Sequence, residues 1–257
     1  MRRFSFVIAA AFMAALASHA GATNLIVNGD FQSGNTGFTS DYSYNTLNPE
    51  PELVEGAYSV VEKAGGVHFA WLDDFYDHTL GTSSGRYFVA NASSDTDLAV
   101  WQSNSITVSQ ANTPYRFEAW ISKIYQFESN PPQLAFQIGD GTNWTNLGST
   151  ASLDEVNPGE WLFTYADGQF AAAGTYYVRL KNANGGDGGN DLGLDDIYFG
   201  LRSASPSVGS TPGSESVTTY NVAAVPEPST WAMALTGLAA GGLMIRRTRQ
   251  RRGGAAL

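Results

Sequence analysis

The sequence has no cysteine among its 257 residues. Disulfide bonds, thiolate catalysis and cysteine-ligated zinc or iron–sulfur sites are therefore excluded. Basic residues are scarce in the central part, since residues 24–202 hold 22 acidic and 7 basic side chains, a difference of 15 negative charges. A body this acidic repels phosphate backbones, which argues against a nucleic-acid partner. The 43% of hydrophobic residues excludes a disordered chain.

The first 22 residues have the pattern of a secretory signal peptide. Arg2 and Arg3 precede an uncharged apolar run from Phe4 to Leu16, and small residues follow up to Ala22. This run is shorter than the about 20 apolar residues that a membrane-spanning helix needs. We therefore expect residues 1–22 to be cleaved and the body to lie outside the cytoplasm.

The C-terminal part reads as a linker followed by a membrane segment. Residues 203–224 are rich in Ser, Thr and Pro, which predicts a flexible stalk. In residues 225–252, an apolar stretch from Trp231 to Ile245 precedes a cluster of five arginines. This order predicts a transmembrane helix over about 231–245 with the arginines on the cytoplasmic side.

Pro226, Glu227 and Pro228 stand directly before that apolar stretch. Motif, apolar span and arginine cluster together resemble the PEP-CTERM sorting signal of exopolysaccharide-producing Gram-negative bacteria. The resemblance implies an exosortase-type membrane transpeptidase as partner. It also implies a precursor anchored in the inner membrane and a final place at the cell surface, the outer membrane or the extracellular matrix. An ordinary single-pass anchor is the alternative.

Between the two ends, short runs of aromatic and β-branched residues alternate with Gly, Asn and Pro breaks, and no helical period of useful length occurs. The pattern predicts one all-β sandwich or jelly roll over residues 23–202. The runs are Leu25–Val27, Tyr58–Val61, His68–Trp71, Tyr87–Ala90, Ala99–Val108, Tyr115–Ile124, Leu134–Ile138, Trp144–Leu147, Trp161–Tyr165, Tyr176–Leu180 and Leu194–Phe199.

Alternation within the runs assigns faces to the side chains. Tyr115, Phe117, Ala119 and Ile121 are expected in the core, as are the apolar residues that alternate in 134–138 and 176–180. The outward residues combine aromatic rings with charged and amide groups, which is the composition of a sugar platform. The candidate sugar-binding residues are Arg116, Glu118, Trp120, Gln137, Trp144 and Arg179; the alternative is an ordinary solvated sheet.

The two ends of the body, Asn24–Gln32 and Leu194–Phe199, look like the first and last strands of the galactose-binding-like jelly roll found in many carbohydrate-binding modules. The resemblance implies that the ends lie side by side and hold a structural calcium ion. Hard cations take carboxylate and carbonyl oxygens from several segments. The implied ligands are Asn28, Asp30, Gln32, Asp195 and Asp196, although many such modules carry Glu where this chain has Gln32.

His68 to Thr79 is the segment in which histidine meets carboxylates, with Asp73, Asp77 and His78 as possible acid–base or metal groups. Neither a nucleophile elbow nor a zincin motif is present. We therefore expect an exported, non-catalytic protein that associates with exopolysaccharide through a calcium-supported jelly roll. The alternatives are a purely structural biofilm protein without a defined sugar ligand and, third, a polysaccharide hydrolase.

Overall fold

The computed structural model describes residues 23–45, 52–127, 130–148, 150–186, 188–206, 219–220 and 225. The signal peptide, Pro226, Glu227, Pro228, the apolar span and the arginine cluster lie outside this part. Within it the elements are, in chain order, β1 Phe38–Thr39, β2 Ser43–Tyr44, β3 Ala57–Val61, η1 Ala64–Gly66, β4 Tyr87–Asn91, β5 Ala99–Ser103, β6 Ile106–Val108, β7 Pro114–Lys123, β8 Gln133–Gly139, β9 Trp144–Asn146, β10 Ala151–Ser152, β11 Trp161–Phe170, β12 Gly174–Asn182, β13 Leu192–Leu201, η2 Arg202–Ala204 and β14 Thr219–Tyr220.

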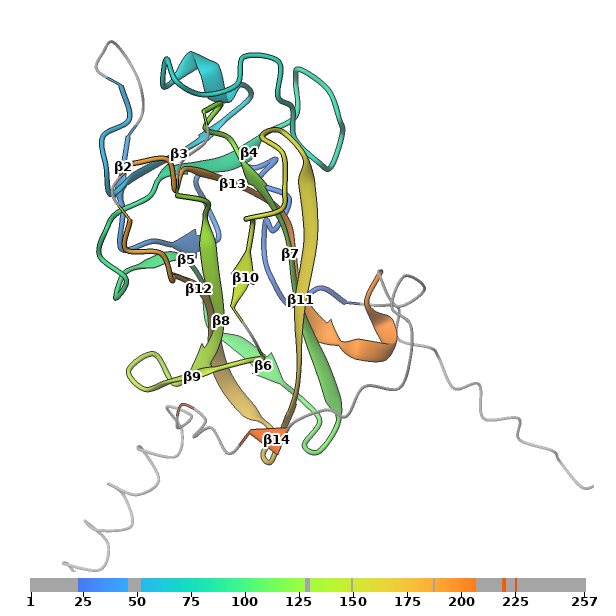
Figure 1. Ribbon diagram of the computed structural model, residues 1–257. Coiled ribbons are helices and arrows are strands. Elements are labelled where there is room, and N and C mark those ends of the chain that lie inside the picture. Colours follow the sequence, from blue (N-terminus) through green and yellow to red (C-terminus); the bar gives the residue numbers. More distant parts are fainter. Residues whose placement is uncertain are drawn as a thin grey trace, which may run out of the picture.

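The strands form two sheets that face each other (Figure 1). Sheet A has the order β1-β5-β12-β8-β10, with β6 on β12 and β9 on β8; sheet B has the order β14-β11-β7-β13-β4-β3-β2. The predicted all-β sandwich is confirmed. No helix in the described ranges has both the length and the apolar character needed to span a membrane.

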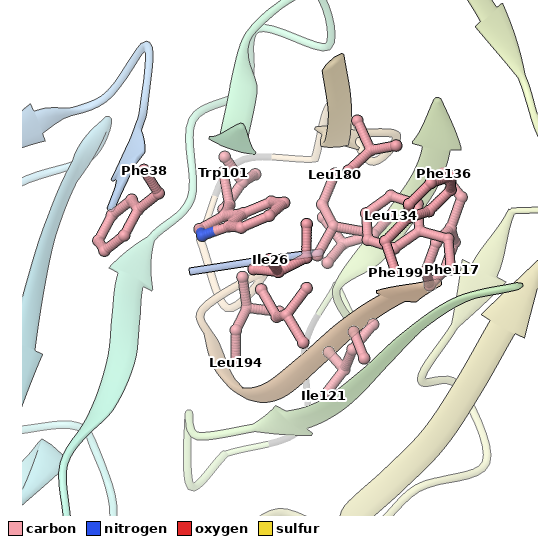
Figure 2. Close-up of a cluster of buried hydrophobic side chains, with 14 of the residues drawn as sticks. Ile26, Phe38, Trp101, Phe117, Ile121, Leu134, Phe136, Leu180, Leu194 and Phe199 are labelled. Atoms are coloured by element: carbon pink, nitrogen blue, oxygen red, sulfur yellow. The ribbon is translucent and has the colours of Figure 1, made fainter. Parts of the chain in front are cut away.

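The core lies between the sheets, where the predicted inward residues meet. Phe117 of β7 packs edge-on against Phe136 of β8 with ring centres 4.8 Å apart, and this contact joins sheet B to sheet A (Figure 2). Tyr115, Ala119 and Ile121 are also buried in this cluster. The alternation therefore assigned the inner faces correctly.

Two predicted strands are wrong. Residues 25–27 are not a strand, because the Asn24 side chain occupies the backbone groups of β13: its Nδ2 donates to Ile197 O at 2.8 Å and its Oδ1 accepts from Phe199 N at 3.0 Å. The opening segment still runs beside β13 as predicted, and a side chain at Gly29 would collide with the Ile197 carbonyl. His68–Trp71 is a loop with one bridge, from Trp71 to Tyr125.

The outer face of sheet B is covered by other parts of the chain. At one end, the segment between β3 and β4 packs Trp71 and Phe75 against Tyr87 and Val89 in a second apolar cluster. Further along, the chain after β13 crosses β7, where buried Ser205 donates to the Glu118 carboxylate. The body thus continues past the predicted boundary at 202, and Val225 N also donates to Thr175 O at 2.8 Å.

Candidate functional site

Sheet A carries a row of polar side chains across four neighbouring strands on its outer face. The register places Gln102 of β5 beside Arg179 of β12, Arg179 beside Gln137 of β8, and Gln137 beside Asn146 of β9. Because residues in register on adjacent strands point to the same face, these four groups form one continuous line. We call this line the sheet A row.

Arg179 is the centre of the row. Its Nε donates to Gln137 Oε1 at 2.6 Å, and Gln137 Nε2 donates to Asn146 Oδ1 at 2.6 Å. Its guanidinium carbon lies 4.0 Å from the centre of the Trp144 ring, within the range of a cation–π contact. Partial burial lowers the pKa of Arg179, although an arginine stays protonated in proteins. The predicted Gln137, Trp144 and Arg179 therefore come together as one cluster.

The other three candidate sugar residues lie on sheet B, where two of them are closed off. Arg116 is fully buried against Asp167, and Glu118 is 2% exposed beneath Ser205. The expectation that they face solvent is wrong, because alternation gives the side of the sheet but not what covers it. Trp120, on the same face, keeps partial exposure.

A cleft of about 680 Å³ opens on the sheet B side, between the opening segment, the loop after η1 and β13. Its floor is the pair of rings Trp120 and His78, stacked with centres 3.8 Å apart. Phe163 packs against Trp120 at 5.3 Å. The lining also includes Asn24, Ile26, Asn28, Gly29, Asp30, Glu118, Asp196, Ile197, Tyr198 and Pro206. Because His78 and Phe163 both contact the Trp120 ring, little of its face is left for a ligand.

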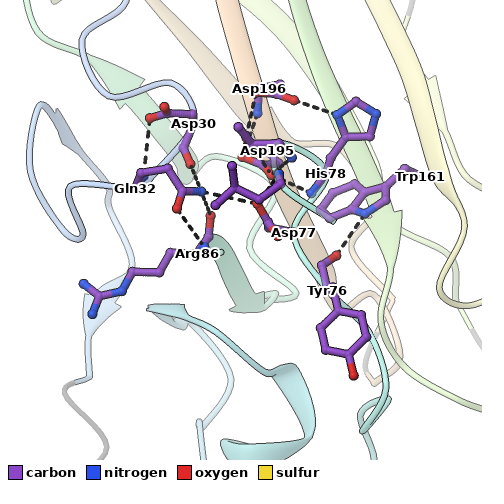
Figure 3. A network of polar contacts seen from close by, with 11 residues as sticks. Asp30, Gln32, Tyr76, Asp77, His78, Arg86, Trp161, Asp195 and Asp196 are labelled. Atoms are coloured by element: carbon purple, nitrogen blue, oxygen red, sulfur yellow. Dashed lines mark hydrogen bonds and ion pairs between the residues drawn. The ribbon is translucent and has the colours of Figure 1, made fainter. Parts of the chain in front are cut away.

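A bulge in β13 shapes the wall of this cleft. The register of β13 on β7 shifts between Asp195 and Tyr198, and Asp196 has a φ of 45°. Such bulges re-aim a side chain, and here Asp196 Oδ2 lies 2.6 Å from His78 Nδ1 (Figure 3). Asp195 points to the same loop but is buried, and burial raises its pKa to about 8.

The five predicted calcium ligands are near one another in the fold but do not converge on one point. Asn28 Nδ2 donates to the carbonyls of Gly34 and Thr36. Asp195 Oδ2 accepts from His78 N at 2.7 Å and Thr79 N at 3.0 Å. Within the described ranges, no group of three or more His, Cys, Asp or Glu side chains is arranged to hold a metal ion.

Oxygen atoms do gather around the Gln32 amide (Figure 3). Its Nε2 donates to Asp30 O and Arg86 O, both at 3.0 Å, and lies 3.4 Å from Asp77 Oδ2. Two carbonyls, a carboxylate and the amide's own oxygen form a donor set that suits a hard cation. This set adds Asp77 and the Arg86 carbonyl to the predicted Asp30 and Gln32. The sequence could not indicate the carbonyl, because any residue provides one.

The possible catalytic residues are separated by the structure. Asp73 is exposed, whereas Asp77 is buried and accepts from Leu80 N at 2.7 Å. Only His78 reaches the cleft, and its ring is held by Asp196 and Trp120. The arrangement positions a loop, with Asp77 and Asp195 each accepting backbone N–H groups from that loop.

Comparison with known proteins identifies the C-terminal segment. Residues 224–250 match the model of the PEP-CTERM protein-sorting motif. This motif indicates an exported protein that is anchored in the membrane before exosortase processing. No curated protein sequence matches this chain.

Several solved carbohydrate-binding modules are similar in fold. One is the EclA C-terminal domain, a sugar-binding protein (TM-score 0.33, 15% identity, 39% of this chain and 66% of that chain). Another is the CBM22-1 xylan-binding domain from Paenibacillus barcinonensis Xyn10C (TM-score 0.41, 12% identity, 67% and 90%). A third is TmCBM61 in complex with β-1,4-galactotriose (TM-score 0.40, 16% identity, 70% and 99%). At these scores the similarities indicate no ligand for this chain.

Proposed function

We propose that this protein is an exported, non-catalytic polysaccharide-binding protein and that sheet A provides its binding face. The observation that carries the proposal is the fixed cluster of Arg179, Trp144 and Gln137, in which Arg179 and Trp144 stay partly exposed. Sugar recognition needs an aromatic surface for the apolar face of a pyranose and fixed polar groups for its hydroxyls. The sheet A row provides the polar groups and the adjacent Trp144 provides the ring, while the corresponding face of sheet B is covered.

The sorting motif gives the setting of this proposal. A protein delivered by an exosortase-type transpeptidase to the surface or matrix of a Gram-negative bacterium would be surrounded by extracellular polysaccharide. Many weak contacts to one polymer then reinforce one another through effective concentration. Moderate affinity at a single sheet face would therefore be enough.

We further propose that calcium supports the loops at the cleft end of the body. The ion would be held by Asp77, the Asp30 and Arg86 carbonyls and Gln32, after the Gln32 amide turns its oxygen toward them. With one carboxylate in the set, affinity would be modest. The ion would stabilise the loops and take no part in sugar contacts on sheet A.

The test is a glycan array with the full chain in detergent, comparing wild type with Trp144→Ala and Phe69→Ala. Phe69 is a matched control, because it is an aromatic side chain that is 74% exposed and lies in the loop after η1 rather than on a strand of sheet A. We expect binding to fall roughly 5- to 150-fold in the Trp144 variant, since an aromatic ring that stacks on its ligand contributes on the order of 1–3 kcal/mol. If Trp120→Ala abolishes binding and Trp144→Ala does not, the cleft is the sugar site and our assignment is wrong.

A structural protein without a sugar ligand is the second candidate, favoured by one observation. Phe127 is 54% exposed and packs against Tyr125, so that aromatic surface near Phe69 is left open. Open aromatic surface is typical of protein–protein contacts. A folded chain that binds no glycan and self-associates through Phe69 and Phe127 would establish this function instead.

A further inference from the structure

The guanidinium of Arg179 is held in one position before any ligand arrives. Trp144 lies across its face at 4.0 Å, and Gln137 accepts from its Nε at 2.6 Å. Gln137 is 7% exposed and is itself fixed by Asn146. Because the side-chain entropy of Arg179 is already lost, a ligand that bonds its outer nitrogens loses little further freedom.

Those outer nitrogens have no counterion in the described part of the chain. The other arginines there are paired: Arg86 with Glu62 at 3.5 Å, and Arg116 and Arg202 with Asp167 at 2.6 and 3.2 Å. Arg179 uses only its Nε, and its two terminal nitrogens make no hydrogen bond or ion pair with any described residue. The N–H groups on these two nitrogens lie in one plane and match the geometry of a carboxylate. A guanidinium can bind a carboxylate through two parallel hydrogen bonds.

The surroundings of Arg179 favour a single, positioned anionic group over a densely charged polymer. Asp41 and Asp97 lie near enough to affect the pKa of Arg179, but not near enough to pair with it. Lys181, on the same strand, is already paired with Asp97 at 3.2 Å. One unpaired cation bordered by carboxylates would repel a polymer with several sulfates on each sugar. It can accept one carboxylate on a sugar ring.

We propose that the sheet A row selects acidic polysaccharides and that Arg179 binds the carboxylate of a uronic acid residue. This inference rests on the proposed function, because it names the class of sugar that the same face takes. The Trp144 ring would pack beside the pyranose, and the partly exposed Gln102 amide would bond a hydroxyl, while Gln137 holds Arg179 in place. The net negative charge of the body weakens approach at low salt, so recognition would be strongest where ions screen that repulsion.

The experiment compares two probes that share a backbone and differ in charge: polygalacturonate and its fully methyl-esterified form. The full chain in detergent is titrated with each at 150 mM salt, with alginate, galactan and xylan as further polymers. We expect the acid form to bind at least tenfold tighter than the ester, since a charge-assisted pair contributes on the order of tenfold or more. Arg179→Gln should remove this preference, so that acid and ester bind equally, and Arg179→Lys should retain only part of it.

The outcomes separate this inference from the function on which it rests. Equal binding of acid and ester by the wild-type chain, or an acid preference that survives Arg179→Gln, overturns the role of Arg179. Binding to galactan or xylan without binding to any uronic-acid polymer overturns the acidic class but upholds polysaccharide binding. If the wild-type chain is folded, as shown by a cooperative melt, and binds none of the polymers, both the inference and the proposed function are overturned.

Discussion

Arg116 and Asp167 form a bidentate ion pair on sheet B, with Arg116 Nε 2.6 Å from Asp167 Oδ1 and Arg116 Nη2 2.8 Å from Asp167 Oδ2. Arg116 is fully buried, and its guanidinium lies 4.1 Å from the centre of the Tyr165 ring. Asp167 also accepts Arg202 of the C-terminal segment at 3.2 Å. The pair thus fixes the segment that covers this face.

Replacing Arg116 by Met should lower the free energy of unfolding by about 3–5 kcal/mol, because the buried Glu118 would lose its cation and Asp167 would keep only Arg202. Urea unfolding followed by tryptophan fluorescence measures the change. The matched variant Arg116→Met/Asp167→Leu removes both charges and should recover part of the loss. A loss below about 1 kcal/mol in the single variant would mean that the pair contributes no more than an exposed ion pair does.

Stability should fall as pH rises through the range set by two buried carboxyls. Burial raises the pKa of Asp191 to about 6 and that of Asp195 to about 8, from the ordinary aspartate value of 3.8. As the pH rises, each of these carboxyls loses its proton in the unfolded chain before it does so in the folded chain. Each group therefore lowers the free energy of unfolding between about pH 4 and its own pKa in the folded chain. Asp191 alone accounts for about 2–3 kcal/mol between pH 4 and 6.

Asp191→Asn isolates this contribution, because the new amide oxygen can still accept from Trp71 Nε1, which lies 2.7 Å from Asp191 Oδ2. The free energy of unfolding of the variant minus that of the wild type should increase from pH 4 to 6 and then stay level. Chemical denaturation at half-unit pH steps measures it. A difference that is constant across the range would show that Asp191 ionises normally in the folded chain.

Calcium should raise the melting temperature, and chelation should lower it, by mass action on the folded state. Asp77→Asn should abolish the calcium response, since it removes the one carboxylate of the proposed set. Asp196→Asn serves as the control, because Asp196 pairs with His78 instead. An identical melt at saturating calcium and in chelator would exclude the ion.

No reducing ends should be released from any polymer that the protein binds. Three carboxylates line the cleft, and each already has a partner: Glu118 accepts from Ser205, Asp196 pairs with His78, and Asp30 accepts from Gln32 N at 3.3 Å. Prolonged incubation with bound polymer, followed by a reducing-sugar assay, tests this. Turnover that is lost in His78→Ala but retained in Asp73→Ala would point to a hydrolase centred on the cleft.

Much of the sandwich could be predicted, because apolar and polar residues alternate with a period of two within each strand, and this alternation is visible in the sequence of the strand alone. Tyr115, Phe117, Ala119 and Ile121 are buried as that alternation requires. The opening segment could not be predicted as a turn, since Leu25–Val27 has strand-forming residues. Its conformation depends on the Asn24 side chain bonding to Ile197, 173 residues away in the sequence.

Only half of the candidate sugar-binding residues come together in the structure, and the reason is again a long-range contact. Alternation predicts that Arg116 and Arg179 both point away from the core, and both do. What differs is the third layer: Ser205 and Arg202 cover the outer face of sheet B, whereas the row of Arg179 stays partly exposed. Such covering is a long-range contact of a segment whose composition resembles a linker.

The path of the chain after β13 also determines how a mechanical load would enter the body. A pull from beyond residue 225 meets the hydrogen bond from Val225 to Thr175 first, and then the short parallel pairing of β14 with β11. Among the residues that the structure describes, these bonds lie between such a load and Arg202 with its partner Asp167. Because Thr175 and Arg179 both belong to β12, a shear of the surrounding matrix that pulls on the tail would load the strand at the centre of the sheet A row from the start.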